Sequence, residues 1–211
     1  MALLYRFLFF FIGLIILTFG ICMTIVADFG AGAWDALNVA LTETVGLSIG
    51  RWVMIVGALL IFVNALLHKN KPEFLAIGII VAIGSLIDLW MILFLGGWEP
   101  SGLIEQLSMF LGGIIVIGIG AAIYLQPKFP LNPIDTLMMG IKKRLNVNIM
   151  TAKTIGELIA LFLALILKGP IGLGTLIITF AIGPVIQLFF PTFEKLLNKL
   201  ITSTEKNPEI G

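Results

Sequence analysis

Long apolar stretches separated by short polar ones make up almost the whole chain. Six of them are close to the roughly 20 residues that a helix needs to cross a bilayer. A backbone in lipid must satisfy its own hydrogen bonds, and no stretch alternates like a barrel strand, so each is predicted to be a transmembrane helix. The predicted spans are residues 5–27, 49–67, 73–95, 107–126, 150–167 and 172–191.

The two halves of this pattern are related in sequence. Residues 13–49 align with residues 113–149 without a gap, which places FGAGAWDAL over FPLNPIDTL. After a slip of one residue, IGSLID at 83–88 lies over IGPVIQ at 182–187. The agreement of these segments indicates an internal duplication.

Each copy contains three spans, the first copy covering about residues 7–95 and the second about 107–191. Because three is odd, the second copy is predicted to have the opposite orientation, with a pseudo-twofold axis in the membrane plane. The expected fold class is an all-α integral membrane protein, a single membrane domain of two inverted three-helix repeats, followed by a polar tail at 201–211.

Composition agrees with a membrane protein and excludes several functions. Hydrophobic residues make up 59% of the chain and charged residues 12%, against about 45–50% and 25% in soluble domains. The net charge of +1 gives no reason to expect a nucleic-acid partner. No metal-binding cluster, phosphate-binding loop or nucleophile motif is present, so we expect no metal, no cofactor and no enzyme activity. The lone His68 is predicted to lie in a solvated loop.

The basic residues fall mostly on one side of the predicted topology. With the N-terminus inside, ten Lys or Arg residues are cytoplasmic, whereas only Arg51 and Lys168 are outside and Lys153 lies within a span. Positive residues accumulate in cytoplasmic loops, so both termini are predicted to be cytoplasmic. The ten are Arg6, Lys69, Lys71, Lys128, Lys142, Lys143, Arg144, Lys195, Lys199 and Lys206.

A segment too polar to cross the membrane follows the first span of each copy. Asn132 followed by Pro133 is typical of a helix start, and the apolar residues beyond it recur on one helical face. Each copy should therefore carry a short amphipathic helix. Two placements remain open: the helices lie on opposite membrane surfaces, or they dip between the spans so that their N-termini meet near the centre.

The same segments carry the first candidate site residues. Asp35 and Asp135 occupy equivalent positions in the two copies, beside Trp34 and after Asn132. If the helices dip, these carboxylates could bind a cation or proton near the protein centre. The alternative is that both aspartates only stabilise the first turn of a helix.

Two further carboxylates lie within predicted spans. Asp88 and Glu157 should each cost roughly 2.5–3.5 kcal/mol at mid-bilayer, so each must face protein or a wet cavity. Neither is repeated, because Gln187 and Gly57 hold the equivalent positions. They are candidates for proton coupling or substrate binding, or they form interhelical hydrogen bonds, with Lys153 as a local partner for Glu157.

With FGAGAWDAL, FPLNPIDTL and GLGTLIITFAIGPVIQ in view, the chain resembles the YczE branch of the YczE/YitT family of bacterial multi-pass membrane proteins over about residues 7–191. YitT-like members often carry an additional soluble C-terminal domain, and here the sequence ends in TSTEKNPEIG. The resemblance implies a multi-pass protein of the bacterial cell (inner) membrane. It implies no substrate.

Together these features favour a small secondary transporter or exporter of a small solute or ion, driven by a gradient or a partner. The alternative is a non-transporting scaffold or accessory protein for another membrane complex. The expected partners are the lipid bilayer and the solute. Small-residue faces such as Gly118 with Ala122 are expected to pack inside the protein, with a homodimer as the alternative.

Overall fold

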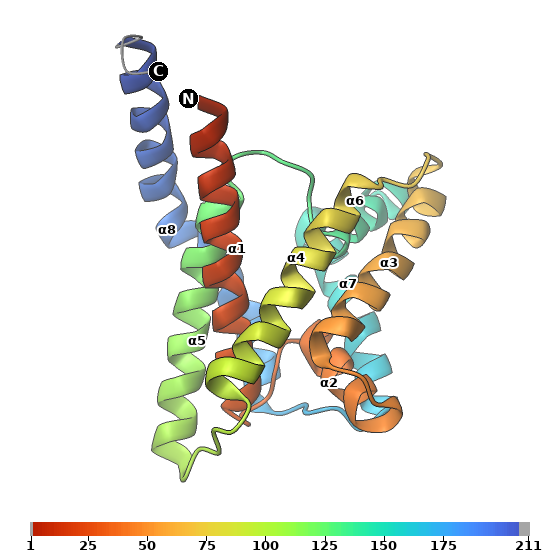
Figure 1. The fold of residues 1–211 in the computed structure, drawn as a ribbon. Coiled ribbons are helices and arrows are strands. Elements are labelled where there is room, and N and C mark those ends of the chain that lie inside the picture. Colours follow the sequence, from red (N-terminus) through yellow and green to blue (C-terminus); the bar gives the residue numbers. More distant parts are fainter. Residues whose placement is uncertain (1, 207–211) are drawn as a thin grey trace.

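The computed structural model describes residues 2–206, and within this range the chain is helical throughout apart from its connecting segments (Figure 1). The elements are α1 (Ala2–Val26), α2 (Ala33–Val45), α3 (Ile49–His68), α4 (Leu75–Trp90) with a π-helical end (Met91–Leu95), α5 (Leu103–Tyr124), α6 (Pro133–Leu145), α7 (Ile149–Ile166) and α8 (Leu173–Lys206).

Six of these helices are long and apolar enough to cross a membrane, which confirms the predicted spans and the all-α fold class. The first five match the predicted ranges to within a few residues. The last one is longer than predicted, because α8 continues to Lys206 and includes residues 201–206 of the predicted polar tail. The rest of that tail, residues 207–211, lies outside the described residues.

The helices form two groups. In the first, which we call the α1 group, α1 packs along α5, α4 packs on α1, and α8 packs on α5. In the second, the α2 group, α2 and α3 contact each other, α6 and α7 contact each other, and the pairs α2–α7 and α3–α6 join them. Figure 1 shows the two groups side by side, with α4 between α1 and α3.

Glycines allow the closest packing inside the α1 group. A Cβ added to Gly20 would lie 2.6 Å from the Ile117 backbone nitrogen and 2.9 Å from the Gly113 carbonyl oxygen on α5. Gly118 faces Val185 of α8 in the same way. These small residues therefore serve helix packing within the protein, as the sequence predicted.

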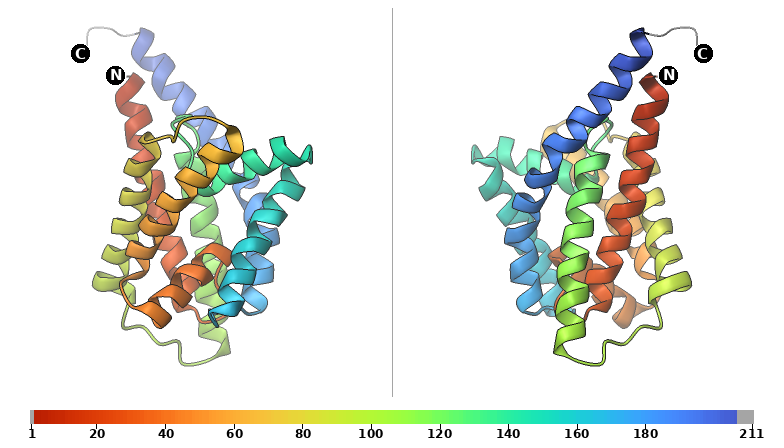
Figure 2. Two further views of the ribbon diagram at one scale, coloured as in Figure 1. Left: turned by 90° about the vertical axis from the view of Figure 1, so that its right-hand side faces the viewer. Right: turned by 90° about the vertical axis from the view of Figure 1, so that its left-hand side faces the viewer.

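Both described ends of the chain lie at the same end of the bundle, which we call the terminal end (Figure 1). The opposite, distal end carries the connections α1–α2, α2–α3, α4–α5 and α7–α8. Figure 2 shows α2 running obliquely toward the distal end and α6 lying near the terminal end. With an even number of spans, both ends must lie on the same side of the membrane. That this side is the cytoplasm stays a prediction.

The order of one long, one short and two long helices occurs twice along the chain, and α1 and α5 run in opposite directions (Figure 1). Most contacts are also paired as an inverted repeat requires: α2–α7 with α3–α6, α2–α3 with α6–α7, and α1–α4 with α5–α8. Two pairings differ. α3 packs along α4 whereas α7 and α8 barely touch, and α1 contacts α8 whereas α4 and α5 barely touch. A rotation that superposes the two halves stays a prediction.

Candidate functional site

Two small cavities adjoin within and beside the α2 group. The first, about 150 Å³, contains Asp35 and is also lined by residues of α1, α5 and α8. The second, about 140 Å³, contains Asp135 and lies between α2, α6 and α7. Both cavities share the side chains of Trp34, Lys153 and Glu157. Four of the six candidate residues, Trp34, Asp35, Asp135 and Glu157, are therefore gathered in one region.

Trp34 and Asp35 reach this region because α2 begins inside the protein. Its first turn closes with a 2.7 Å hydrogen bond from the Ala36 amide to the Gly32 carbonyl oxygen. Every residue from Ala33 to Ala40 is buried except Asp35, which is half-buried because it faces the cavity. A helix lying on a membrane surface would expose one whole face, so the start of α2 fits the alternative of a helix that dips between the spans.

Asp135 is held differently. The Asn132 side chain accepts a 3.2 Å hydrogen bond from the Ile134 amide and so caps α6, with Pro133 in the first turn. The Tyr124 hydroxyl, at the end of α5, donates a 3.1 Å hydrogen bond to the Asp135 carboxylate. Asn132 thus has a structural contact and lines neither of the two cavities.

The rest of α6 resembles an interfacial helix. It buries Pro133, Leu137, Gly140 and Ile141 along one face, and its last turn carries Lys142, Lys143 and Arg144. This arrangement matches an apolar face on the protein and a basic end at the headgroups. The two short helices, equivalent in sequence, are therefore not placed alike.

The shared residues Lys153 and Glu157 lie one turn apart on α7. The Lys153 ammonium attracts both Asp135 and Glu157 through space, without a hydrogen bond to either carboxylate among the described residues. Glu157 in turn lies within electrostatic reach of Asp35. Three carboxylates thus face a single cation, and if all of them are ionised the region carries an excess of negative charge. Charge of this kind needs a bound cation or protons to offset it.

Asp88, the remaining candidate, does not belong to this region. Its carboxylate accepts a 2.6 Å hydrogen bond from the Ser48 hydroxyl and a 2.8 Å hydrogen bond from the Gly50 amide, at the start of α3. Asp88 therefore makes the interhelical hydrogen bonds that the sequence offered as the alternative to coupling.

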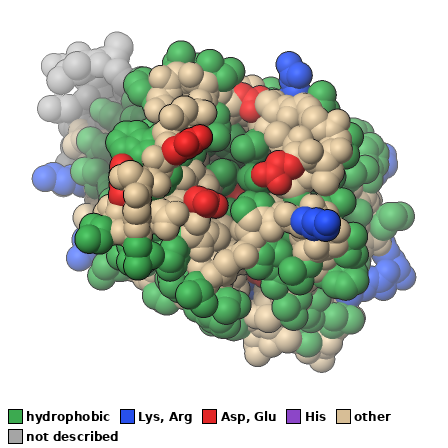
Figure 3. Space-filling model, turned by 90° about the horizontal axis from the view of Figure 1, so that it is seen from below, with side chains coloured by type: hydrophobic (Ala, Val, Ile, Leu, Met, Phe, Trp, Pro, Cys, Tyr) green, Lys and Arg blue, Asp and Glu red, His purple; other side chains and the backbone are tan. Residues whose placement is uncertain are grey.

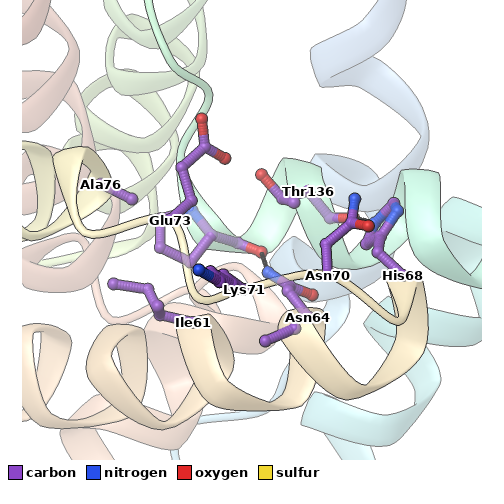
Figure 4. A pocket seen from close by; sticks show the side chains of 10 residues that line it. Ile61, Asn64, His68, Asn70, Lys71, Glu73, Ala76 and Thr136 are labelled. Atoms are coloured by element: carbon purple, nitrogen blue, oxygen red, sulfur yellow. Dashed lines mark hydrogen bonds between the residues drawn. The ribbon is translucent and has the colours of Figure 1, made fainter.

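A larger cavity, about 360 Å³, lies near the terminal end between α3, α6 and the start of α4 (Figure 4). The Asn64 amide on its wall donates a 2.8 Å hydrogen bond to the Pro133 carbonyl oxygen, and its buried oxygen has no partner. His68 also lines it, 3.2 Å from the Thr136 carbonyl oxygen.

The prediction of a solvated loop for His68 is therefore wrong, because the residue ends α3 and packs half-buried against α6. Sequence reasoning also missed Tyr124 and Asn64. Asn64 gave a usable signal, since it is an uncharged polar residue within a predicted span, and such residues commonly bond across helices. Tyr124 gave none, because tyrosine is ordinary near the end of a span.

Comparison with known proteins supports the resemblance seen in the sequence. Residues 4–191 match a family described as "Family of unknown function (DUF6198)". The chain is 35% identical over 190 residues to "Uncharacterized protein YyaS" of Bacillus subtilis, covering 90% of this chain and 94% of that protein. It is 33% identical over 194 residues to "Uncharacterized membrane protein YczE" of the same organism, covering 92% and 89%. A Haemophilus influenzae protein is 28% identical over 187 residues, covering 86% and 81%. No solved structure matches the chain.

Proposed function

Because this chain belongs to the DUF6198 family and is a YczE-type membrane protein, we propose from its own geometry that it is a secondary transporter of a small solute rather than an enzyme. The cavities that contain Asp35 and Asp135 would bind the solute or the coupling ion. Asp35, Asp135 and Glu157 would supply the negative charge, and Trp34 an aromatic wall.

The observation that carries this proposal is the pair of cavities between the helices, both of which are lined by ionisable side chains. A transporter needs a polar space between its spans, because a solute must leave water and be bound on its way across. A scaffold has no such need, and its interior would be packed with apolar side chains. Buried carboxylates are expensive in a membrane protein and are mostly kept for function.

The charge of the site favours a cationic solute. Three carboxylates and one ammonium leave a net attraction for positive charge, and the ring of Trp34 can also bind a cation on its face. The distal face adds to this preference, because acidic side chains gather on it (Figure 3). Asp28, Glu43 and Glu99 are exposed in the distal connections and at the end of α2. Arg51 and Lys168 are also exposed at this end, so the face carries an excess of acidic side chains rather than a single sign of charge. Such an excess raises the local concentration of ions of the opposite sign.

The direct test is solute flux into liposomes that contain the purified protein. Small organic cations such as methylammonium and guanidinium are the first probes, with acetate as an anion of similar size. We expect the cations to enter faster than into protein-free liposomes and acetate not to. If the folded protein transports no solute of a broad panel, the scaffold alternative replaces the transporter. If it transports acetate and none of the cations, the charge argument is wrong.

A further inference from the structure

We infer that the α2 group rocks against the α1 group, and that the structure is the state closed at the distal end and open toward the terminal end. In the opposite state, α7 would close on α8 at the terminal end while α3 separates from α4 at the distal end. This movement would expose the proposed solute site to each side in turn, so its role in transport rests on the proposed function.

The contact that closes the distal end lies between α3 and α4. A Cβ added to Gly50 or to Gly84 would collide with the carbonyl oxygen of the other glycine, so the two backbones meet there directly. The hydrogen bonds from Ser48 and Gly50 to Asp88 fasten the same contact. Further along the pair, Gly57 packs against the Ile80 side chain, at 2.6 Å from an added Cβ.

The equivalent contact between α7 and α8 is open. By the alignment of the two halves, Gly84 corresponds to Gly183 on α8, and an atom added there would meet nothing within 4 Å. Gly57 and Ile80 correspond to Glu157 and Thr179, which face the same 150 Å³ cavity instead of each other.

The connecting segments repeat this difference. At the distal end, the Ala31 amide donates to the Pro170 carbonyl oxygen at 3.2 Å, and the Gly174 amide donates to the Phe29 carbonyl oxygen at 2.9 Å. By the alignment, the counterparts of these two contacts at the terminal end are the pairs Leu131–Lys71 and Phe129–Leu75. No backbone hydrogen bond joins either pair within the described chain.

Cavities occupy the terminal end where the distal end is closed. Phe129 and Leu75 both line an apolar cavity of about 320 Å³. Thr136 and Asn70 both line the 360 Å³ cavity. Their distal equivalents, Ala36 and Gly169, are so close that a Cβ on Gly169 would lie 2.6 Å from the Ala36 carbonyl oxygen. The helix contacts, the connecting segments and the cavities therefore all indicate that the terminal end is the open one.

Gly183 supports a second state most directly. Nothing around it in this structure requires a glycine, and a glycine inside a helix costs about 1 kcal/mol relative to alanine. A close approach of α7 would require one, as α3 requires Gly84. Pro184 follows at once and weakens the helix there, so α8 can bend at this point. In the movement, the α3–α4 contact is replaced by a similar contact between α7 and α8. Two states related in this way are expected to differ by only a few kcal/mol.

Disulfide trapping tests the inference in native membranes, in a Cys22→Ala background. The distal pair Ser48→Cys with Asp88→Cys should cross-link readily, because these side chains are 2.6 Å apart. The equivalent terminal pair, Asn148→Cys with Gln187→Cys, should also cross-link, but roughly 10- to 1,000-fold more slowly if the second state holds about 0.1–10% of the molecules. Each single-cysteine variant is the matched control.

The outcomes separate this inference from the proposed function. Failure of the terminal pair to cross-link above its single-cysteine controls, while the distal pair cross-links fully, would overturn the rocking movement even if the protein transports. Cross-linking of both pairs without solute flux would leave the movement standing and remove its role in transport. We expect both pairs to cross-link and each cross-link to stop flux until a reductant is added.

Discussion

Asp35→Asn is expected to abolish solute flux while the protein still inserts and folds. The change removes one negative charge from the first cavity and keeps the shape of the side chain. Removing one partner of a buried charge pair costs about 2–5 kcal/mol, which corresponds to a loss of roughly 30- to 4,000-fold in binding. Initial rates of cation uptake into liposomes, compared at equal amounts of folded protein, measure this loss.

Glu194→Gln is the matched control for this change. It also converts a carboxylate to an amide, but Glu194 is exposed on α8 away from both cavities, so uptake should remain at the wild-type rate. Asp35→Glu keeps the charge and should retain more uptake than Asp35→Asn. If Asp35→Asn takes up cations at the wild-type rate, Asp35 does not bind the solute and only stabilises the first turn of α2.

Alanine substitutions at the equivalent positions Gly84 and Gly183 are expected to have opposite effects on stability. Gly84→Ala forces a methyl group against the Gly50 carbonyl oxygen. Such overpacking costs about 1–3 kcal/mol, which lowers the thermal midpoint by roughly 2–12 °C. Gly183→Ala meets open space and gains helix propensity, so its midpoint should stay the same or rise slightly.

Flux should not follow stability in this pair. Gly183→Ala blocks the α7–α8 contact of the second state, so it should reduce flux at least about tenfold if that contact is worth more than 1.4 kcal/mol. Gly112→Ala is the control, because Gly112 on α5 lines neither solute cavity and a Cβ added there meets only the flexible end of the Met23 side chain, at 3.3 Å. If Gly183→Ala transports like the wild type, the α7–α8 closure is wrong.

The architecture could be predicted from the sequence because each of its signals is local. Span length and hydropathy located the six long helices, and the Asn132-Pro133 pair located the start of α6. The equivalence of Asp35 and Asp135 pointed to the region where the two cavities lie. No knowledge of long-range packing was needed for these steps.

The difference between the two halves could not be predicted in this way. An alignment treats equivalent residues alike, so it implies the same contact for α3–α4 and α7–α8, whereas the structure closes one and opens the other. That choice depends on the conformation of the whole protein. For the same reason, the sequence could not separate Asp88, bonded to Ser48 and Gly50, from Glu157, which faces a cavity.

Access to the cavity from the two sides of the membrane tests the central claim most directly. Thr179→Cys in the Cys22→Ala background places one thiol in the cavity that contains Asp35, and a membrane-impermeant thiol reagent can be added to right-side-out or inside-out vesicles. We predict labelling from both sides, faster from the side of the two termini, because the structure is open toward that end. A thiol that reacts from neither side, or from one side only under every condition, would contradict a solute pathway through this protein.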